Sequence, residues 1–509
     1  MSRGRYGVAL TEELHEAAKE HLLRPDGQED ICFALWRPSS GATRQSALIQ
    51  SLILPREGDR LLHGNVSFTP QFFERALAEA AAAGLGLAML HSHPAGIGWQ
   101  DMSEPDRVAE STNAGAVLGA TGRPFLGMTL GGRDAAWSAR FWERVAPRTY
   151  ESRWCSCVRV VGERLSPTFM PALAPPPNLT STTVRTVSAW GPAIHADLVR
   201  LRVGIVGAGS TGGFVAETLA RTGFEDLLLL DFDKIEDHNL DRLVYATQAD
   251  VGRLKVSVLD QRLRQDATSE KFDVVAMAQG VFEPEAFRSA LDCDILVSCV
   301  DRPWGRHVLN HIAYAHLIPV VDAGILVRMH RKGHLVGADW SAQTVGVGRP
   351  CLECLGQYDS GMVQLERDGM LDDPSYIEGL SDDHPLKARQ NVFAFSMACA
   401  SLQVLQLLSL VVAPQGCANA GVQRYHFVGS EMEPRRFGTC HENCLMPGLV
   451  GMGDDSPYQV TGTRPAARGG HENLPAEIPP EVGRGRSVVA AAAQWFLSLL
   501  RGRRRRSLH

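Results

Sequence analysis

Apolar and polar positions in the first part of the chain predict a helix followed by a buried strand. The stretch QFFERALAEAAAA, residues 71–83, is rich in helix formers, and Gly84 after it is typical of a helix C-terminus. The apolar run LGLAML, residues 85–90, has the length of a buried strand. The run ICFALW, residues 31–36, predicts an earlier strand in the same region.

A second strand and helix are predicted in the middle of the chain, joined by a glycine-rich turn. The apolar run LRVGIV, residues 201–206, leads into GAGSTG at 207–212, and a helical pattern continues through Phe224. The next apolar run, 227–230, predicts a strand that ends at Asp231. The later segment DILVSCVD predicts a further strand with Asp301 at its carboxyl end.

Changes in composition mark the expected domain boundaries. Residues 171–181, PALAPPPNLTS, hold four prolines and predict a stiff linker. After Gly448 the chain is rich in glycine, proline and charge, and we expect it to be mobile. The predicted parts are a first domain 1–165, a linker 166–182, a second domain 183–450, a flexible linker 451–485 and a C-terminal helix 486–509.

The C-terminal stretch combines an apolar segment with a basic end. Residues 488–500 are nearly all apolar, and Arg501 and Arg503 to Arg506 follow them. The segment is too short to span a bilayer. As a helix it would dock on a partner or lie on an anionic membrane surface, with packing on the protein's own core as the alternative.

Composition and charge exclude several classes of protein. Of 509 residues, 44% are hydrophobic and 21% are charged, which excludes wholesale disorder and the collagen-like and coiled-coil classes. The formal net charge of −6 gives no reason to expect nucleic-acid binding. We expect a cytoplasmic location, because there is neither a signal-peptide pattern nor an apolar run of spanning length.

Two histidines directly after the predicted strand at residues 85–90 suggest a metal site. His91 and His93 follow the predicted strand and are separated by one residue, so both can face one ion where the chain leaves regular alternation. Zinc binds imidazole nitrogens and carboxylate oxygens, and a catalytic zinc keeps one position for water. Asp106 is the candidate third ligand, and Ser103 stands between it and the histidines.

The run HSHPAGIGWQDMSEPD, with an upstream glutamate, resembles the signature of the JAMM (MPN-type) metalloproteases, a distant Glu followed by His-x-His and Ser-x-x-Asp. The resemblance implies an α/β domain in which His91, His93 and Asp106 hold zinc. Ser103 would stabilise the tetrahedral oxyanion, and Glu29 would be the general base for the attacking water. Nine residues separate His93 from Ser103 where the common pattern has seven, which implies a longer loop. An inactive MPN domain is the alternative.

The glycine-rich turn fits a dinucleotide as well as ATP. Gly207, Gly209 and Gly212 form a GxGxxG between strand and helix, where phosphate can approach backbone N–H groups. Asp231 lies 19 residues beyond Gly212 and can bind ribose hydroxyls. ATP activation additionally needs positive groups for the β and γ phosphates and a carboxylate for Mg²⁺.

Further residues of this segment distinguish ATP from NAD. The motifs follow in a fixed order: Asp231-Phe-Asp233, Asn239-x-x-Arg242, Gly252-x-x-Lys255 and a strand ending near Asp301. This order resembles the ThiF/MoeB/ubiquitin-activating adenylyltransferase family over residues 183–448, and it implies a Rossmann-like domain with a mostly parallel sheet. The resemblance implies that Asp231 binds the ribose of ATP, that Asn239, Arg242 and Lys255 bind the triphosphate, and that Asp301 holds Mg²⁺. Asp233 is included among the cofactor-binding residues as the second acid of its motif. Arg185 matches an arginine that reaches into the neighbouring subunit's site, which implies a homodimer.

The eleven cysteines include two close pairs, Cys351/Cys354 and Cys440/Cys444, whose spacing suggests a metal before a disulfide. In the ThiF-type family two such pairs hold a structural zinc; His441 is the alternative ligand, because the second pair has one residue more than the usual two between its cysteines.

Thioester-forming members of this family carry a nucleophilic cysteine after the first pair, and residues 355–396 contain none. We therefore expect adenylation without a cysteine intermediate. Cys399 is expected in the core, and Cys417 is the main candidate outside this stretch.

A zinc isopeptidase and an adenylating enzyme on one chain act in opposite directions on one substrate. Together they imply a ubiquitin-like protein that the first domain processes or deconjugates and the second activates with ATP. The fusion is similar to bacterial ubiquitin-like conjugation systems, some linked to phage defence, and a conjugating enzyme is then an expected partner. The alternatives are activation of a sulfur-carrier protein and a scaffold with two degenerate sites.

Overall fold

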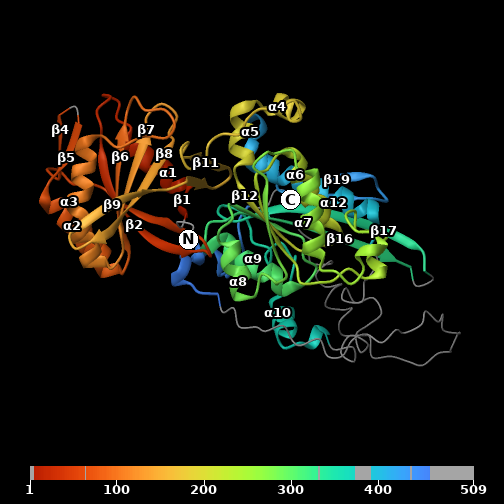
Figure 1. Ribbon diagram of the computed structural model, residues 1–509. Helices are drawn as coiled ribbons and strands as arrows, with labels where there is room; N and C mark the ends of the chain where they lie inside the picture. Colours follow the sequence, from red (N-terminus) through yellow and green to blue (C-terminus); the bar gives the residue numbers. More distant parts are fainter. Residues whose placement is uncertain (1–4, 64, 331–332, 373–390, 436–437, 459–509) are drawn as a thin grey trace, which may run out of the picture. The chain divides into compact units, whose positions relative to one another are not determined.

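The computed structural model describes residues 5–63, 65–330, 333–372, 391–435 and 438–458 (Figure 1). The predicted C-terminal helix 486–509 lies outside the described residues, as does the segment 459–485. All of the described residues belong to one compact unit, within which the chain builds two large sheets.

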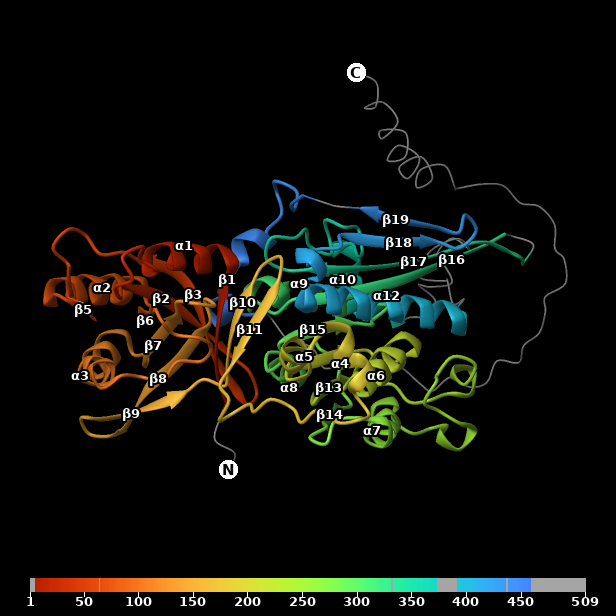
Figure 2. The same cartoon turned by 90° about the horizontal axis from the view of Figure 1, so that it is seen from above.

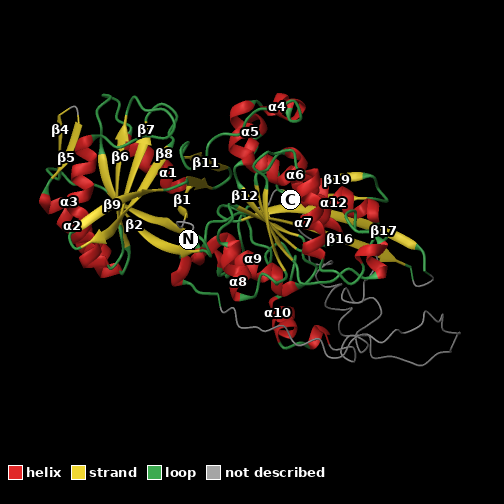
Figure 3. Cartoon of the chain, viewed as in Figure 1, coloured by secondary structure: helices red, strands yellow, loops and turns green. Residues whose placement is uncertain are grey.

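The N-terminal domain is a mixed sheet of nine strands in the order β11-β10-β1-β3-β2-β6-β7-β8-β9, with helices on both faces (Figure 3). Helix α1 (Glu12–Leu22) packs on one face, and α2 (Pro70–Ala83) and α3 (Glu104–Thr121) pack on the other. The strands are β1 (Arg5–Thr11), β2 (Ile31–Ser40), β3 (Arg44–Ile53), β6 (Gly86–His93), β7 (Phe125–Gly131), β8 (Trp137–Ala146), β9 (Thr149–Trp154), β10 (Cys157–Val161) and β11 (Leu165–Phe169), with a separate hairpin of β4 (Arg60–His63) and β5 (Asn65–Phe68).

The predicted helix and strand at 71–90 are confirmed, with one correction. Helix α2 starts after Thr69, whose side chain accepts a hydrogen bond from the backbone N–H of Phe72, and it ends at Gly84 in the left-handed conformation. Strand β6 continues through His93 and does not end at Leu90. Because alternate residues of a strand share a face, regular strand geometry itself places the two histidines on one side.

The linker predicted at 166–182 begins later than expected. Strand β11 (Leu165–Phe169) pairs antiparallel with β10 and belongs to the N-terminal sheet. Leu165 and Phe169 are buried, which holds the strand in place although it contains Pro167. This proline is tolerated because β11 is an edge strand.

The second domain is built on an eight-stranded sheet in the order β14-β13-β12-β15-β16-β17-β18-β19 (Figure 2). The first five strands in this order are parallel to one another, and the last three join them antiparallel. The strands are β12 (Arg202–Val206), β13 (Asp226–Leu230), β14 (Asp273–Met277), β15 (Ile295–Ser298), β16 (Val320–Met329), β17 (Leu335–Val345), β18 (Val422–His426) and β19 (Glu431–Arg435).

Helices cover both faces of this second sheet. One apolar core contains α6 (Ser210–Thr222), α7 (Lys255–Asp266) and α12 (Phe393–Val412), and the other contains α8 (Pro284–Ala290) and α9 (Pro303–Ala315). The order of the parallel strands reverses between β12 and β15. In doubly wound sheets, ligands bind at the carboxyl ends of the strands at such a point.

Helix α12 is the one helix in the described ranges that is long and apolar enough to cross a membrane. It is mostly buried, and its polar side chains bond to the second sheet. The Gln403 side chain donates to the carbonyl oxygens of Ser298 and Val321, at 2.7 and 2.9 Å. These contacts are those of a core helix.

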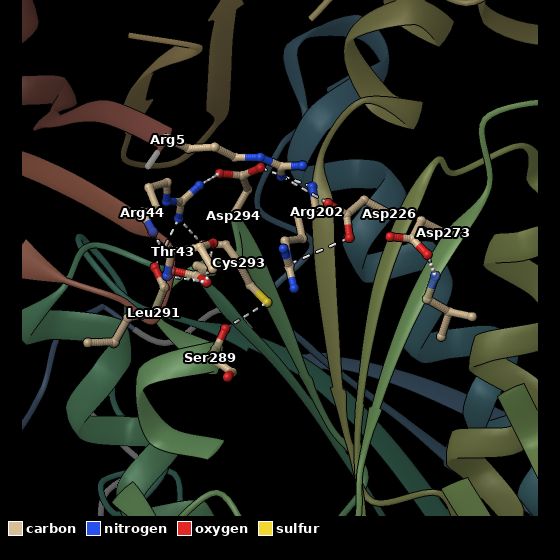
Figure 4. Close-up of polar contacts among 12 residues, drawn as sticks. Arg5, Thr43, Arg44, Arg202, Asp226, Asp273, Ser289, Leu291, Cys293 and Asp294 are labelled. Atoms are coloured by element: carbon tan, nitrogen blue, oxygen red, sulfur yellow. Dashed lines mark hydrogen bonds and ion pairs between the residues drawn. The ribbon is translucent and has the colours of Figure 1, made fainter. Parts of the chain in front are cut away.

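The two domains share a buried polar contact, drawn in Figure 4. Arg44, on β3, donates from Nη1 to Asp294 Oδ1 at 2.5 Å, and both side chains are less than a tenth exposed. Beside it, the backbone N–H and hydroxyl of Thr43 donate to Asp292 Oδ2 at 3.0 and 2.7 Å. Asp292 and Asp294 stand at the amino end of β15, at the opposite end of the strand from the glycine-rich turn.

Part of the segment predicted as a flexible linker is packed onto the rest of the protein. The backbone N–H of Gly451 donates to the carbonyl oxygen of Tyr314 at 3.0 Å, and Asp454 Oδ1 accepts from the backbone N–H of Ser40 at 3.1 Å. The ring of Tyr458 stacks on Phe287. The prediction was wrong for 451–458, because glycine and charge in this segment serve close packing and specific hydrogen bonds.

Candidate functional site

The candidate nucleotide site of the second domain starts at the glycine-rich turn after β12. A Cβ on Gly212 would lie 1.9 Å from the carbonyl oxygen of Gly207, and one on Gly207, where φ is +99°, would lie 2.6 Å from the carbonyl oxygen of Cys299. These two glycines are therefore required by packing. A Cβ on Gly209 would meet nothing within 4 Å, so open space adjoins the backbone where α6 begins. Phosphate binds readily at such a helix N-terminus.

Asp231 connects the ends of two neighbouring strands. Its Oδ2 accepts from the backbone N–H of Ala208, in the glycine-rich turn, at 2.7 Å, and its Oδ1 accepts from that of Asp233 at 2.7 Å. Burial raises the pKa of Asp231, and the nearby Lys255 ammonium opposes that rise. The carboxylate thus holds the glycine-rich turn in shape.

The predicted triphosphate-binding residues lie on the segment that follows. Lys255 donates to Asp233 Oδ2 at 2.7 Å, and Arg242 donates to the Asp241 carboxylate at 2.8 Å. The hydroxyl of Ser210, the first residue of α6, donates to the carbonyl oxygen of Arg242 at 2.9 Å, so the basic segment adjoins the helix start. Asn239 is buried, and its side-chain oxygen accepts from the backbone N–H of Glu236 at 3.2 Å. That oxygen is therefore used to shape its own turn.

Asp301 and Arg185 occupy different surroundings. Asp301 follows β15 by three residues, is exposed, and has no hydrogen bond or ion pair to any residue that the structure describes. Because Asp301 follows a parallel strand, it lies at the same edge of the sheet as the glycine-rich turn after β12. Arg185 is exposed on α4 (Val184–Trp190), which precedes β12, and its role across a subunit interface stays a prediction.

The N-terminal domain brings His91, His93 and Asp106 together as predicted. Asp106 Oδ2 lies 3.4 Å from Nε2 of each histidine. Ligand atoms about 2.0–2.1 Å from a tetrahedral zinc are ~3.4 Å apart. Two imidazole nitrogens and one carboxylate oxygen in this arrangement fit a zinc ion that keeps a fourth position open.

Glu29 stands beside this cluster, just before β2. It is half-buried, and burial raises the pKa of its carboxyl group, while the two histidines oppose the rise. It has no hydrogen-bond or ion-pair partner among the described residues. A carboxylate with a raised pKa and no competing partner is suited to general base chemistry.

Ser103 and Asp106 form the N-terminal cap of α3. Ser103 Oγ accepts from the backbone N–H of Asp106 at 3.3 Å, and Asp106 Oδ2 accepts from the backbone N–H of Ser103 at 2.9 Å. Ser103 also forms a side-chain hydrogen bond with the Asp106 carboxylate, which helps to lower the pKa of Asp106.

Ser92 and Asp30 support the cluster and were not predicted from the sequence. Ser92 lies between the two histidines; its Oγ donates to the carbonyl oxygen of Leu22 at 2.7 Å and accepts from the backbone N–H of Asp30 at 3.1 Å. The Asp30 carboxylate is buried and accepts from Arg60 Nη2 at 2.9 Å. The sequence signal that could have found Ser92 and Asp30 is their position next to the predicted site residues His91, His93 and Glu29.

A second support lies behind His91. Arg140 and Glu110 are fully buried and paired with each other, and Arg140 Nη1 donates to Thr129 Oγ1 at 2.6 Å. Thr129 Oγ1 is 3.4 Å from His91 Nε2. No sequence motif marks this pair, because a buried ion pair is defined only by contacts between separate elements.

The four predicted cysteine ligands form one cluster. The sulfur atoms of Cys351, Cys354, Cys440 and Cys444 all lie within 4.8 Å of one another. The sulfur atoms of Cys351 and Cys444 are 3.6 Å apart, close to the ~3.8 Å expected between thiolates bonded at about 2.3 Å to a tetrahedral zinc.

Backbone N–H groups face these sulfur atoms. The N–H of Cys351 donates to the sulfur of Cys440 at 3.2 Å, and that of His441 donates to the sulfur of Cys354 at 3.4 Å. The side chain of His441 is not part of the cluster. The donor set therefore fits a four-cysteine zinc site.

The remaining candidate cysteines differ in exposure. Cys399 is 1% exposed in α12, which confirms that it belongs to the core. Cys417 is exposed in the loop after that helix.

Comparison with known families identifies the second domain. The profile of the ThiF family matches residues 181–446, more than half of the chain. The chain therefore belongs to the ThiF family. Residues 1–180 lie outside this match, and the JAMM resemblance of the N-terminal domain stays a prediction.

Curated relatives match a shorter segment. The chain is 31% identical over 156 residues to the adenylyltransferase and sulfurtransferase uba4 of Neosartorya fischeri, covering 30% of this chain and 29% of that protein. It is 30% identical over 168 residues to the sulfur carrier protein ThiS adenylyltransferase of Bacillus subtilis, covering 32% of this chain and 46% of the relative. The molybdopterin-synthase adenylyltransferase of Escherichia coli is 30% identical over 158 residues, covering 31% and 59%. The chain thus spans less than two thirds of each relative.

Among solved structures, E. coli MccB with ATP is similar over 53% of this chain and 74% of its own, with 17% identity and a TM-score of 0.40.

Proposed function

We propose that the second domain uses ATP to adenylate the C-terminal carboxylate of a ubiquitin-like protein. The observation that carries this proposal is the arrangement at the strand-order reversal, where a glycine turn held by Asp231 adjoins Arg242 and Lys255. The adenylyltransferase names of the curated relatives support it.

In the proposed reaction a carboxylate oxygen of the protein substrate attacks the α-phosphorus of ATP. A new P–O bond forms, the bond to the bridging oxygen breaks, and pyrophosphate leaves with the electron pair. Backbone N–H groups at the start of α6 would hold phosphate oxygens. Lys255 and Arg242 now pair with carboxylates and would turn to the β and γ phosphates.

Asp301 would hold Mg²⁺, since it is an exposed carboxylate without a partner in the described part of the chain. When bound, Mg²⁺ neutralises charge on the phosphates and on the leaving pyrophosphate. Asp231 keeps the turn in place while these groups bind.

The test is ATP/pyrophosphate exchange with a panel of purified ubiquitin-like and sulfur-carrier proteins that end in Gly-Gly. We expect exchange that depends on one such protein and falls at least about 100-fold in Asp301→Ala. Asp273→Ala is the matched control, because Asp273 is at the amino end of β14. Exchange at full rate in Asp301→Ala would contradict the role of this residue.

A sulfur-carrier protein is the second candidate substrate. The Bacillus subtilis relative is named for a sulfur carrier protein, and the chemistry of adenylation is the same for both substrates. Stimulation of exchange by sulfur carriers alone would favour this alternative over a conjugation system with a conjugating enzyme.

We further propose that the N-terminal domain is a zinc-dependent isopeptidase that processes or deconjugates the same protein. His91, His93 and Asp106 would hold the ion, which supplies a Lewis acid and lowers the pKa of a water molecule. Glu29 would accept the proton of the attacking water and return it to the leaving amine. Ser103 would turn its hydroxyl from Asp106 to the oxyanion and donate a hydrogen bond to it.

Cleavage of an amide fusion of the protein that stimulates exchange tests this second activity. Glu29→Gln should lower kcat at least about 100-fold while zinc stays bound, because Glu29 is not among the three ligands. Glu20→Gln, on the exposed side of α1, is the control. Unchanged cleavage in Glu29→Gln would exclude it as the base.

The four-cysteine cluster is proposed to hold a structural zinc, which gives two zinc ions per chain. Metal analysis should show the loss of one ion in Cys351→Ser and of the other in His93→Ala. Retention of all zinc in Cys351→Ser would remove the four-cysteine assignment. A homodimer through the second domain and a cytoplasmic location complete the proposal.

A further inference from the structure

The four-cysteine cluster lies between two segments that contact the N-terminal domain. The first is Arg349, two residues before Cys351. Its guanidinium is buried and donates from Nη1 to the carbonyl oxygen of Gly162 at 2.7 Å and from Nη2 to that of Glu163 at 2.6 Å. These two carbonyls belong to the turn between β10 and β11. The first cysteine pair therefore starts beside a contact with the N-terminal sheet.

The second segment follows Cys444 and reaches β2 and β3 of the N-terminal domain. The side-chain amide of Gln50 donates to the carbonyl oxygen of Gly451 at 2.6 Å, and the backbone N–H of Ser40 donates to Asp454 Oδ1 at 3.1 Å. A Cβ on Gly453, where φ is +53°, would lie 2.2 Å from the carbonyl oxygen of Pro38. This close approach requires glycine. Residues 451–454 are thus fitted to the N-terminal domain.

Tyr314, on α9, connects these two segments. Its hydroxyl donates to the carbonyl oxygen of Arg349 at 2.7 Å, and its own carbonyl oxygen accepts from the backbone N–H of Gly451 at 3.0 Å. The same hydroxyl is 4.0 Å from the sulfur of Cys440. One side of α9 therefore contacts the cysteine cluster and both segments at once.

The ends of the cluster are distant in sequence. Cys351 and Cys440 are 89 positions apart, so an ion bound to both pairs closes a long loop. A metal that fixes Cys351 and Cys444 also fixes the segments attached to them. Without the metal, the segment after Cys444 would keep its hydrogen bonds, the ion pair of Asp455 with Arg37, the stacking of Tyr458 on Phe287 and the burial of Met446, but it would lose its link to Cys351 through the ion.

We propose that the four-cysteine site is a clasp whose metal keeps β2 and the β10–β11 turn of the N-terminal domain docked on the ThiF-family domain. This inference rests on the zinc assignment proposed above and adds a role to it. The bound metal holds the Arg349 and 451–454 segments in register with the β10–β11 turn and with β2. The contact of Arg44 and Thr43 with Asp294 and Asp292 is a separate attachment. The buried apolar cluster that Leu48 and Leu165 share with residues of the second domain is another, so the metal acts on the segments beside the cysteines.

Hydrogen exchange of the full-length protein tests the clasp. The wild type is measured as purified and after zinc is stripped with 1,10-phenanthroline, with zinc quantified in both samples. We expect exchange in peptides covering 38–42 and 449–453 to rise at least about tenfold after stripping. Peptides covering β13 should keep their protection, since this strand is in the core of the second domain.

His93→Ala is the matched control, because it removes a ligand of the other metal site and leaves the four cysteines intact. Exchange at 38–42 should match the wild type in this variant. Asp454→Ala should raise exchange at 38–42 while the protein keeps its zinc. Cys444→Ser should behave as the stripped wild type, and the chelation experiment stands by itself if this variant does not fold.

Two negative results have different meanings. If the protein contains no zinc that depends on Cys351 and Cys444, the metal assignment itself fails. If that zinc is present and is removed, but both peptides keep their protection, the assignment stands and the clasp is excluded.

Discussion

The backbone N–H of Asp30 donates a hydrogen bond to the side-chain oxygen of Ser92 at 3.1 Å. Asp30 directly follows Glu29, and Ser92 stands between His91 and His93. The bond therefore connects the segment of the candidate general base with the segment of two candidate metal ligands. A second bond, from the N–H of Ser92 to the carbonyl oxygen of Asp30 at 3.1 Å, closes the pair.

Substitution of Ser92 by alanine should destabilise the N-terminal domain by about 1–3 kcal/mol, because a buried N–H and a buried carbonyl lose their hydroxyl partner. Chemical denaturation measures this change. Thr112→Ala, at an exposed position of α3, is the control and should stay within about 0.5 kcal/mol of the wild type. Equal stability of Ser92→Ala and the wild type would show that the hydroxyl is dispensable.

Removal of one partner from the buried Arg140–Glu110 pair should cost about 3–5 kcal/mol, because the other charge is left without compensation in the core. Glu110→Ala is the direct test, by denaturant unfolding. A combined Glu110→Leu and Arg140→Met variant should recover much of the loss, since no charge remains buried. Arg140 holds the Thr129 hydroxyl, and that hydroxyl faces His91. If this chain of contacts positions His91, the double variant should bind less zinc than the wild type although its stability is restored.

The folded protein should lose stability against unfolding at mildly acidic pH, through a histidine at the interface between the domains. His316 Nδ1 is 2.9 Å from the hydroxyl oxygen of Ser39, and burial lowers the pKa of His316 to about 3. In the unfolded chain its pKa is about 6.5, so the unfolded state binds more protons between these values. The contribution of His316 is complete above pH 6.5 and is lost as the pH falls toward 3.

Unfolding measured at pH 7.5 and pH 5.5 checks this prediction. The single histidine should contribute about 1 kcal/mol of lost stability between the two conditions. His316→Gln should remove that part of the pH dependence, whereas His238→Gln, at an exposed position, should not. His311 is a second contributor, because burial lowers its pKa to about 4.

No stable thioester should form on this chain during activation. The four clustered cysteines would be bound to zinc, and Cys399 is buried, so none of these five thiolates is available to attack the adenylate. Incubation with ATP, Mg²⁺ and the stimulating protein, followed by non-reducing electrophoresis, should show no thiol-sensitive adduct. An adduct that disappears in Cys417→Ala would identify that exposed residue as a nucleophile.

Local patterns in the sequence predicted the parts of both sites that depend on neighbouring residues. The strand, glycine turn and helix around Gly207 follow from apolar runs and from glycines that only fit without a Cβ. Asp106 was placed with the histidines by a motif, and the structure brings their ligand atoms together.

Contacts between distant segments had no such signal. Arg349 and the segment 451–454 read as ordinary loop residues, because nothing local shows that they face carbonyl and amide groups of the other domain. The predicted flexibility of 451–458 failed for that reason: low apolar content excludes a core position but does not exclude hydrogen-bonded packing.

One oxygen atom of Asp106 serves two purposes. It accepts from the backbone N–H of Ser103 at the start of α3, and it faces Nε2 of His91 and His93. A cation bound to this oxygen draws electron density away from the hydrogen bond with the Ser103 N–H. Metal binding should therefore weaken the N-terminal cap of α3. Asp106→Asn keeps an acceptor for the amide and gives up the charge, whereas Asp106→Ala gives up both. Comparing helix fraying in these two variants separates the contribution of the Asp106 side chain to the stability of the helix from its contribution to metal binding.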